Sequence, residues 1–196
     1  MTRHVHPSAT QIEPYQQGRL DSLCGLYALI NAARLIYADA APLTGQSCKR
    51  LFADGIDFLT AKKGSKDAAY WGMSVGRQRK LAKALLAGTA LEGRPKLHLG
   101  PALPPMTKVD DLDFAIGGAL ARRAVLLVCL HGRVSHHSVI VGHSPDRVLL
   151  FDSDGMQFIR KGSIRFTASL SGGLILHSMI AMHLHRAGAQ PAPRNT

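Results

Sequence analysis

The stretch from Asp21 to Ile36, DSLCGLYALINAARLI, places one cysteine directly before a run of apolar residues with helical spacing. Asp21 and Ser22 carry side-chain oxygens that can cap a helix, and apolar residues then recur three and four positions apart. We therefore predict a mostly buried helix from about Ser22 to Tyr37. Cys24 would lie near the start of this helix, either as a small core residue or as a nucleophile.

The position of Cys24 suits a nucleophile. A thiol attacks a carbonyl as the thiolate, and the unpaired backbone N–H groups at a helix N-terminus favour that form. Gly25, the next residue, would let a substrate backbone approach closely. A lone cysteine near an apolar helix is more often a core residue, so the rest of the chain has to supply a base.

The composition is that of one globular domain. The 196 residues are 46% hydrophobic and 19% charged, which suffices for one sizeable core but not for two. We place the domain at residues 1–186, with 1–19 as an extended lead-in, and we expect 187–196 to be a disordered tail. The sequence contains no apolar run long enough for a membrane span and no secretory signal. We expect a cytoplasmic protein, or one delivered by a route that needs no signal peptide.

Three further helices are predicted from the same spacing of apolar residues. They cover the ranges Gly45–Lys62, Arg77–Ala87 and Val109–Arg123. In the last of these, acidic residues stand in the first turn and arginines at the end, which suits the helix dipole. The Gly64–Gly76 segment is predicted to be a loop, and Gly93–Pro105, with four prolines, is predicted to be extended.

From Ala124 onward the chain changes to short β-branched and apolar runs broken by Gly, Pro and Asp, as in a sheet. These runs are VLLVCLHG (125–132), HHSVIVGH (136–143), RVLLFDSDG (147–155) and MQFIRKG (156–162). Periodicity leaves LILHSMIAMHLH (174–185) as either a strand or a helix. Helices followed by strands predict an α+β fold.

The predicted strands supply a histidine and a carboxylate. A cysteine nucleophile needs a base that accepts and returns a proton, and a third group that orients the base. His136 starts one strand and Asp152 ends the next, which is the spacing of a hairpin, so the two side chains can meet. Asp154 falls in the turn after that strand and is the weaker alternative to Asp152.

These residues, in this order, resemble the papain-like cysteine peptidases, and more narrowly the bacterial C39-like branch. In that superfamily a glutamine precedes a nucleophilic cysteine that begins a helix. A histidine then starts a strand, and an Asn or Asp follows one hairpin later. Here Gln17 precedes DSLCG, His136 has Gly142 six residues on, and DSDG (152–155) is similar to the Asn-Ser-Trp-Gly of papain.

The resemblance implies a papain-like fold, with N-terminal helices packed on a C-terminal antiparallel sheet, and a peptidase that needs no cofactor. It implies Cys24 as the nucleophile and His136 as the base. Asp152 would orient His136, and Gln17 would donate a hydrogen bond to the oxyanion. Gln17 lies seven positions before Cys24, one more than in papain, so Gln16 or a backbone N–H is the alternative donor.

Two histidines compete for the role of base. Alternation along the strand sends His136 and Ser138 to one face of the sheet and His137 and Val139 to the other. The spacing to Gly142 in the resemblance favours His136, and we predict His136 as the base.

The other cysteines and histidines are predicted to be structural. Cys48 lies on an apolar helix face and Cys129 within a strand, and there is no CxxC pair, so we expect free thiols in a reducing compartment. His183 and His185 share one strand face, but no carboxylate or cysteine stands at matching spacing. We predict no metal site.

The formal net charge of +11 is concentrated between Thr60 and Gly100, where basic residues far outnumber acidic ones. We interpret this region as a solvated basic face, with an acidic partner or inhibitor protein as a further hypothesis and nucleic acid as a weaker one. The predicted function is peptide or isopeptide hydrolysis of a protein substrate, in a bacterial effector or toxin as one hypothesis. The alternatives are a deamidase or transglutaminase-type acyl transferase, or a papain-like binding module that uses residues 60–100.

Overall fold

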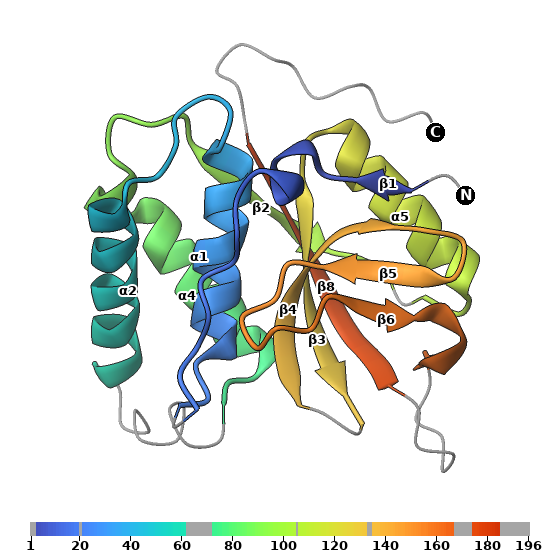
Figure 1. Cartoon of the computed structure of the whole chain (residues 1–196). Helices are drawn as coiled ribbons and strands as arrows, with labels where there is room; N and C mark the ends of the chain where they lie inside the picture. The colour runs from blue at the N-terminus through green and yellow to red at the C-terminus, as the bar shows by residue number, and fades with distance from the viewer. Residues whose placement is uncertain are drawn as a thin grey trace.

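A helical layer packs on one face of a β-sheet, and among the described elements one helix covers the other face (Figure 1). The computed structural model describes residues 3–19, 21–61, 72–104, 106–132, 135–166 and 174–184. On the first face lie α1 (Cys24–Tyr37), α2 (Gly45–Thr60) and α4 (Val75–Ala87), and on the second lies α5 (Val109–Ala121). Helix α1 contacts the sheet directly, whereas α2 packs on α1 and α4.

The sheet is antiparallel along its main path, in the order β2-β8-β3-β4-β5-β6. Two short strands join it from the side: β1 pairs antiparallel with β4, and β7 pairs parallel with β8. The strands are β1 (His4–Val5), β2 (Leu97–Ala102), β3 (Val125–His131), β4 (His136–His143), β5 (Arg147–Leu150), β6 (Phe158–Arg160), β7 (Ile164–Arg165) and β8 (Leu174–Leu184). Short 3-10 helices cover Pro7–Thr10, Thr89–Leu91 and Lys161–Ser163.

Alternation along the central strands divides the core into two parts. Leu127, Val139 and Val141 pack with α1, whereas Leu126 and Ile140 pack with α5. Strands buried on both faces read as continuous apolar runs, which explains the sequence VLLVCLH of β3. The predicted α+β arrangement of helices on a C-terminal sheet is the one observed.

The start of α1 differs from the prediction. The helix begins at Cys24, and the preceding Leu23 makes no side-chain cap. The Asp21 carboxylate instead closes a turn before the helix, where its Oδ1 accepts from Leu23 N at 3.0 Å and its Oδ2 accepts from Gly18 N at 3.1 Å. The cap predicted at Asp21 and Ser22 is therefore wrong, and Cys24 is the first residue of the helix.

The other three helices lie within a few residues of their predicted ranges. Thr44 Oγ1 accepts from Ser47 N ahead of α2, and Ser74 Oγ accepts from Arg77 N ahead of α4. These N-caps start each helix by satisfying a backbone N–H that has no partner within the helix. The cap at Ser74 explains why α4 begins at Val75, two residues before the predicted start.

Pairing on two sides makes residues 174–184 a strand. Strand β8 lies between β2 and β3; it pairs with β3 along most of its length and with β2 over residues 180–184. The lead-in also differs from a merely extended segment, because His4–Val5 pairs with β4 and a 3-10 turn follows.

Among the described residues no helix is long and apolar enough to cross a membrane. The predicted tail at 187–196, His185, and the lysines at 62, 63 and 66 lie outside the described residues, and the domain limits of 1–186 stay a prediction.

Candidate active site

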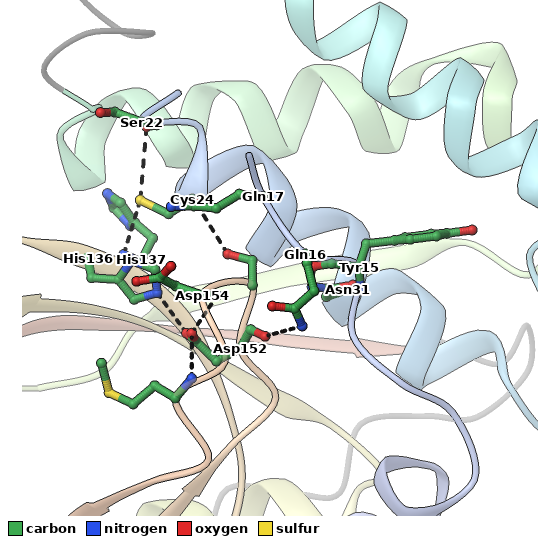
Figure 2. Close-up of polar contacts among 12 residues, drawn as sticks. Tyr15, Gln16, Gln17, Ser22, Cys24, Asn31, His136, His137, Asp152 and Asp154 are labelled. Atoms are coloured by element: carbon green, nitrogen blue, oxygen red, sulfur yellow. Dashed lines mark hydrogen bonds and ion pairs between the residues drawn. The ribbon is translucent and has the colours of Figure 1, made fainter. Parts of the chain in front are cut away.

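His136 and Asp152 meet at the end of the sheet that lies beside the start of α1 (Figure 2). His136 is the first residue of β4, and Asp152 follows β5, the neighbouring strand. Nε2 of His136 lies 2.7 Å from Oδ2 of Asp152, and the two residues are only 7% and 3% exposed. Oδ1 of Asp152 accepts from the backbone N–H groups of Asp154 and Met156, at 2.8 and 3.2 Å. The carboxylate is thus held on one side by the backbone and directs its other oxygen at the imidazole.

The Cys24 thiol lies near the same imidazole and is one of the groups that raise the pKa of His136. The thiol donates to the backbone oxygen of Ser22 at 4.0 Å, and because Asp152 takes Nε2 of His136, Nδ1 is the imidazole nitrogen available to the thiol. The backbone N–H of His137 also donates to Cys24 Sγ, at 3.4 Å. Thiol, imidazole and carboxylate therefore form one row that joins α1, β4 and the loop after β5.

The charges in this row favour a protonated imidazole. Burial alone would lower the pKa of His136, but its hydrogen bond to Asp152, the nearby Cys24 thiol and the charges of both raise that pKa to about 10. Burial would raise the pKa of Asp152, but the hydrogen bond and the charge of His136 outweigh it and hold that pKa below its usual value. The environment thus favours an ion pair between His136 and Asp152 at neutral pH.

His137 has a different environment from its neighbour. Its Nε2 lies 2.7 Å from the backbone oxygen of Met73, which fixes the ring as a hydrogen-bond donor at that nitrogen. Burial lowers the pKa of His137, so the ring is neutral. No carboxylate orients it among its described contacts, and its contribution to the site is the backbone N–H that faces Cys24.

Gly25 serves packing rather than substrate approach. A Cβ at this position would lie 2.7 Å from Sδ of Met73, whose side chain fills the space beside the glycine. The Gly25 backbone oxygen accepts from Nε2 of Gln78 on α4, at 3.2 Å. The expectation that the glycine opens a path for a substrate is therefore wrong, because α4 and the segment before it close that side of α1.

The two candidate glutamines of the lead-in have different partners. The amide of Gln16 donates to the backbone oxygens of Asp152 and Pro14, at 3.2 and 3.4 Å. Oε1 of Gln17 accepts from Oγ of Ser153 at 3.4 Å, and Gln17 N donates to Ser153 O at 2.8 Å. In the view of Figure 2, the Gln17 side chain lies at the Cys24 end of the site, whereas Gln16 lies toward Asn31.

Asn31 holds this lead-in in place, a role that the sequence analysis did not identify. It is fully buried on α1, where its Oδ1 accepts from Tyr15 N at 2.8 Å and its Nδ2 donates to Tyr15 O at 3.0 Å. The side-chain amide thus pairs with the lead-in backbone as a neighbouring strand would. A polar residue within the apolar pattern of α1 was the available signal, because a buried amide has to find partners.

Three predicted residues lie outside the row. Asp154 is exposed, and its described contact with Asp152 is made through its backbone. Cys48 and Cys129 are buried, and burial raises both thiol pKa values, that of Cys129 to about 11. Within the described ranges, no group of three or more His, Cys, Asp or Glu side chains could hold a metal ion.

Comparison with known proteins finds similarity in structure but none in sequence. No protein-family model matches the sequence, and no curated protein matches it. The fold matches the crystal structure of the Carica candamarcensis cysteine protease CMS1MS2 in complex with E-64, with a TM-score of 0.52 and 12% sequence identity. The match covers 95% of this chain and 100% of the protease chain. The predicted papain-like fold is thereby confirmed, while the narrower likeness to the C39-like branch stays a prediction.

Proposed function

We propose that this protein is a cysteine peptidase that cleaves amide bonds of a protein or peptide substrate through a thioester intermediate. The observation that carries the proposal is the row of Cys24, His136 and Asp152, in which the imidazole is bonded to the carboxylate at 2.7 Å and the thiol and carboxylate both raise its pKa. Such a row stabilises a thiolate–imidazolium pair, which is the reactive form of a cysteine nucleophile. The papain-like fold, shared with a protease, supports the same chemistry.

The reaction would proceed in two steps. In the first, the Cys24 thiolate attacks the amide carbonyl, a C–S bond forms, and the carbonyl oxygen becomes an oxyanion. His136 gives its proton to the leaving nitrogen as the C–N bond breaks, which leaves a thioester and a free amine. In the second, His136 takes a proton from water as the water oxygen attacks the thioester carbonyl, the C–S bond then breaks, and the carboxylic acid leaves while the Cys24 thiolate and the protonated His136 are restored.

Gln17 is the proposed donor to the oxyanion, together with the backbone N–H of Cys24 at the start of α1. Ser153 holds the oxygen of the Gln17 amide, and this leaves the amide NH2 group for the substrate. Gln16 uses its amide on the backbone of Asp152 and Pro14, and this fits a role in holding the loop. Preorganised donors of this kind contribute about 10²- to 10³-fold to acyl-transfer rates.

The first test is the rate at which iodoacetamide alkylates each cysteine between pH 4 and 9, followed by peptide mass spectrometry. Cys48 and Cys129 are buried thiols with raised pKa values and serve as internal controls. We expect Cys24 alone to react fast below neutral pH and to lose that advantage in His136→Ala. Equal, slow alkylation of Cys24 in both proteins would contradict the proposal.

A second experiment separates hydrolysis from related acyl transfers. The protein and its Cys24→Ala variant are incubated with a proteome-derived peptide mixture, with and without an added primary amine. New peptide termini indicate a peptidase, release of ammonia without new termini indicates a deamidase, and incorporation of the amine indicates a transferase. We expect new termini that Cys24→Ala abolishes.

A further inference from the structure

A cavity of about 190 Å³ lies between α1, α2 and the lead-in. Its walls are mainly aromatic and aliphatic: Tyr15 from the lead-in, Tyr27 and Ile30 from α1, and Phe52 from α2. Lys49 contributes the charged group among the lining residues. None of these side chains belongs to the row of Cys24, His136 and Asp152.

The walls of the cavity are held in place without a ligand. Both backbone polar groups of Tyr15 are bonded to Asn31, and the Arg34 guanidinium lies 4.1 Å from the centre of the Tyr15 ring. The rings of Tyr27 and Phe52 contact each other with centroids 5.6 Å apart. A preformed apolar cavity binds with little loss of conformational entropy in its walls.

Size and charge define what the cavity would accept. A cavity of about 150 Å³ is enough to hold benzene in another protein, so about 190 Å³ fits one large apolar side chain but is too small for a drug-sized ligand. Lys49 is exposed and takes part in no ion pair among the described residues. An acidic group beside the apolar one would complement that charge.

Two elements that line the cavity, the lead-in and α1, also carry residues of the candidate site. Tyr15 is two residues before Gln17 on the lead-in, and Tyr27 is one helical turn after Cys24 on α1. Ile30 lies six residues after Cys24, a rise of about 9 Å along the helix axis, while an extended peptide covers about 3.3 Å per residue. An extended peptide held at Cys24 is therefore long enough to span that distance within about four residues of the bond that is cut.

We propose that this cavity is a specificity subsite, which accepts a large apolar side chain of the substrate next to an acidic residue, within about four residues of the cleaved bond. The proposal rests on the peptidase activity proposed above. It predicts that the substrate class is peptides and proteins with a pair such as Phe-Glu or Leu-Asp near the cleavage point.

Gly45 gives a way to fill the cavity without disturbing its walls. It lines the cavity as the first residue of α2, and a Cβ built there meets no atom within 4 Å. Gly76, near the start of α4, has the same open surroundings but does not line the cavity. Gly45→Trp and Gly76→Trp therefore form a matched pair, and Lys49→Glu reverses the charge at the rim.

The binding test uses a catalytically dead protein and a small probe. In Cys24→Ala protein, the methyl NMR signal of Ile30 is followed while the dipeptide amide acetyl-Phe-Glu-NH2 is added. We expect a saturable shift that is lost in Gly45→Trp, kept in Gly76→Trp and weakened at least about threefold in affinity by Lys49→Glu. An Ile30 signal that does not move, or that moves equally in both tryptophan variants, would overturn the subsite.

The cleavage test uses the peptide mixture and the active protein. We expect large apolar residues to be enriched at one position within four residues of the cut, with this preference reduced at least tenfold in Gly45→Trp and unchanged in Gly76→Trp. Cleavage without any such preference overturns the proposal. If the Ile30 signal shifts but Cys24 shows no fast alkylation, the peptidase function fails while the cavity remains a binding site.

Discussion

Strand β4 begins and ends with a histidine beside an aspartate, and the two ends behave differently. At the start, Nε2 of His136 lies 2.7 Å from Asp152. At the end, Nδ1 of His143 lies 3.3 Å from Oδ1 of Asp113, an oxygen that makes no hydrogen bond among the described residues. The same pair of residue types thus forms a short hydrogen bond at one end of the strand and a loose contact at the other.

Lys161 explains the difference. Its ammonium group lies 2.6 Å from Oδ2 of Asp113 and 3.5 Å from Nδ1 of His143, so the carboxylate already has a cation. Burial is the main cause that lowers the pKa of His143; Asp113 opposes it, and the charges of Lys161 and of His4, whose ring stacks on His143, lower that pKa further. At this end of β4 the histidine therefore shares its carboxylate with Lys161, whereas His136 has Asp152 without a lysine beside it among their described contacts.

The largest effect is expected from removing the charge of Asp152. In Asp152→Asn, His136 loses the partner that holds its ring and its positive charge, so peptide cleavage should fall about 100-fold or more. Cys24 alkylation at pH 5 should fall with it. The matched variant is Asp113→Asn at the other end of β4, which should leave the Cys24 alkylation rate within about twofold. Equal losses in the two variants would contradict the distinction between the ends.

The raised pKa of His136 also predicts that the stability of the protein depends on pH. His136 has a pKa of about 10 in the folded protein and about 6.5 when unfolded, so the native state holds the extra proton between these values. The free energy of unfolding should be highest below about pH 6.5 and fall toward pH 10, by up to about 1.4 kcal/mol per unit. Urea unfolding of wild type and His136→Gln from pH 6 to 10 measures this slope, which should be much flatter in the variant.

A smaller effect is expected from Asn31, which holds the lead-in rather than the imidazole. Asn31→Ala should lower kcat about tenfold, because Gln17 is no longer fixed beside Cys24, while Cys24 alkylation and its pH profile remain within about twofold. Asn31→Asp keeps the acceptor for Tyr15 N but loses the donor to Tyr15 O. Its kcat should lie between those of wild type and Asn31→Ala. A fall in alkylation equal to the fall in kcat would indicate general damage to the site.

The smallest effect is expected from His143. His143→Gln should leave Cys24 alkylation and peptide cleavage within about twofold of wild type, and should change the free energy of unfolding by about 1 kcal/mol or less. Thermal unfolding and the alkylation assay measure the two quantities on one sample. A loss of cleavage above tenfold would mean that the far end of β4 acts on the site.

Local patterns predicted the elements that carry the site. Helical spacing indicated α1, and hairpin spacing placed His136 beside Asp152, because both periods depend only on nearby residues. The contact of Cys24 with His136 required the family resemblance in addition. The papain-like fold was predictable in the same way, from the order of the motifs rather than from composition.

Contacts between distant segments were not predictable in this way. The space beside Gly25 is filled by Met73 from 48 positions later in the chain, and Asn31 finds its partner in Tyr15 on a segment without regular structure. Strand β8 could be either strand or helix until its pairing with β2 and β3 was known. In each case tertiary packing decides between local conformations of similar energy.

The position of β8 has a consequence for synthesis of the protein. This strand comes last among the described elements, yet it lies between β2 and β3 in the sheet. Among the described strands β2 pairs only with β8, so on the ribosome the β8-facing edges of β2 and β3 stay open until residues 174–184 emerge. A chain stopped before Leu174 would expose both edges, so emergence of this strand is the step that joins β2 to the rest of the sheet.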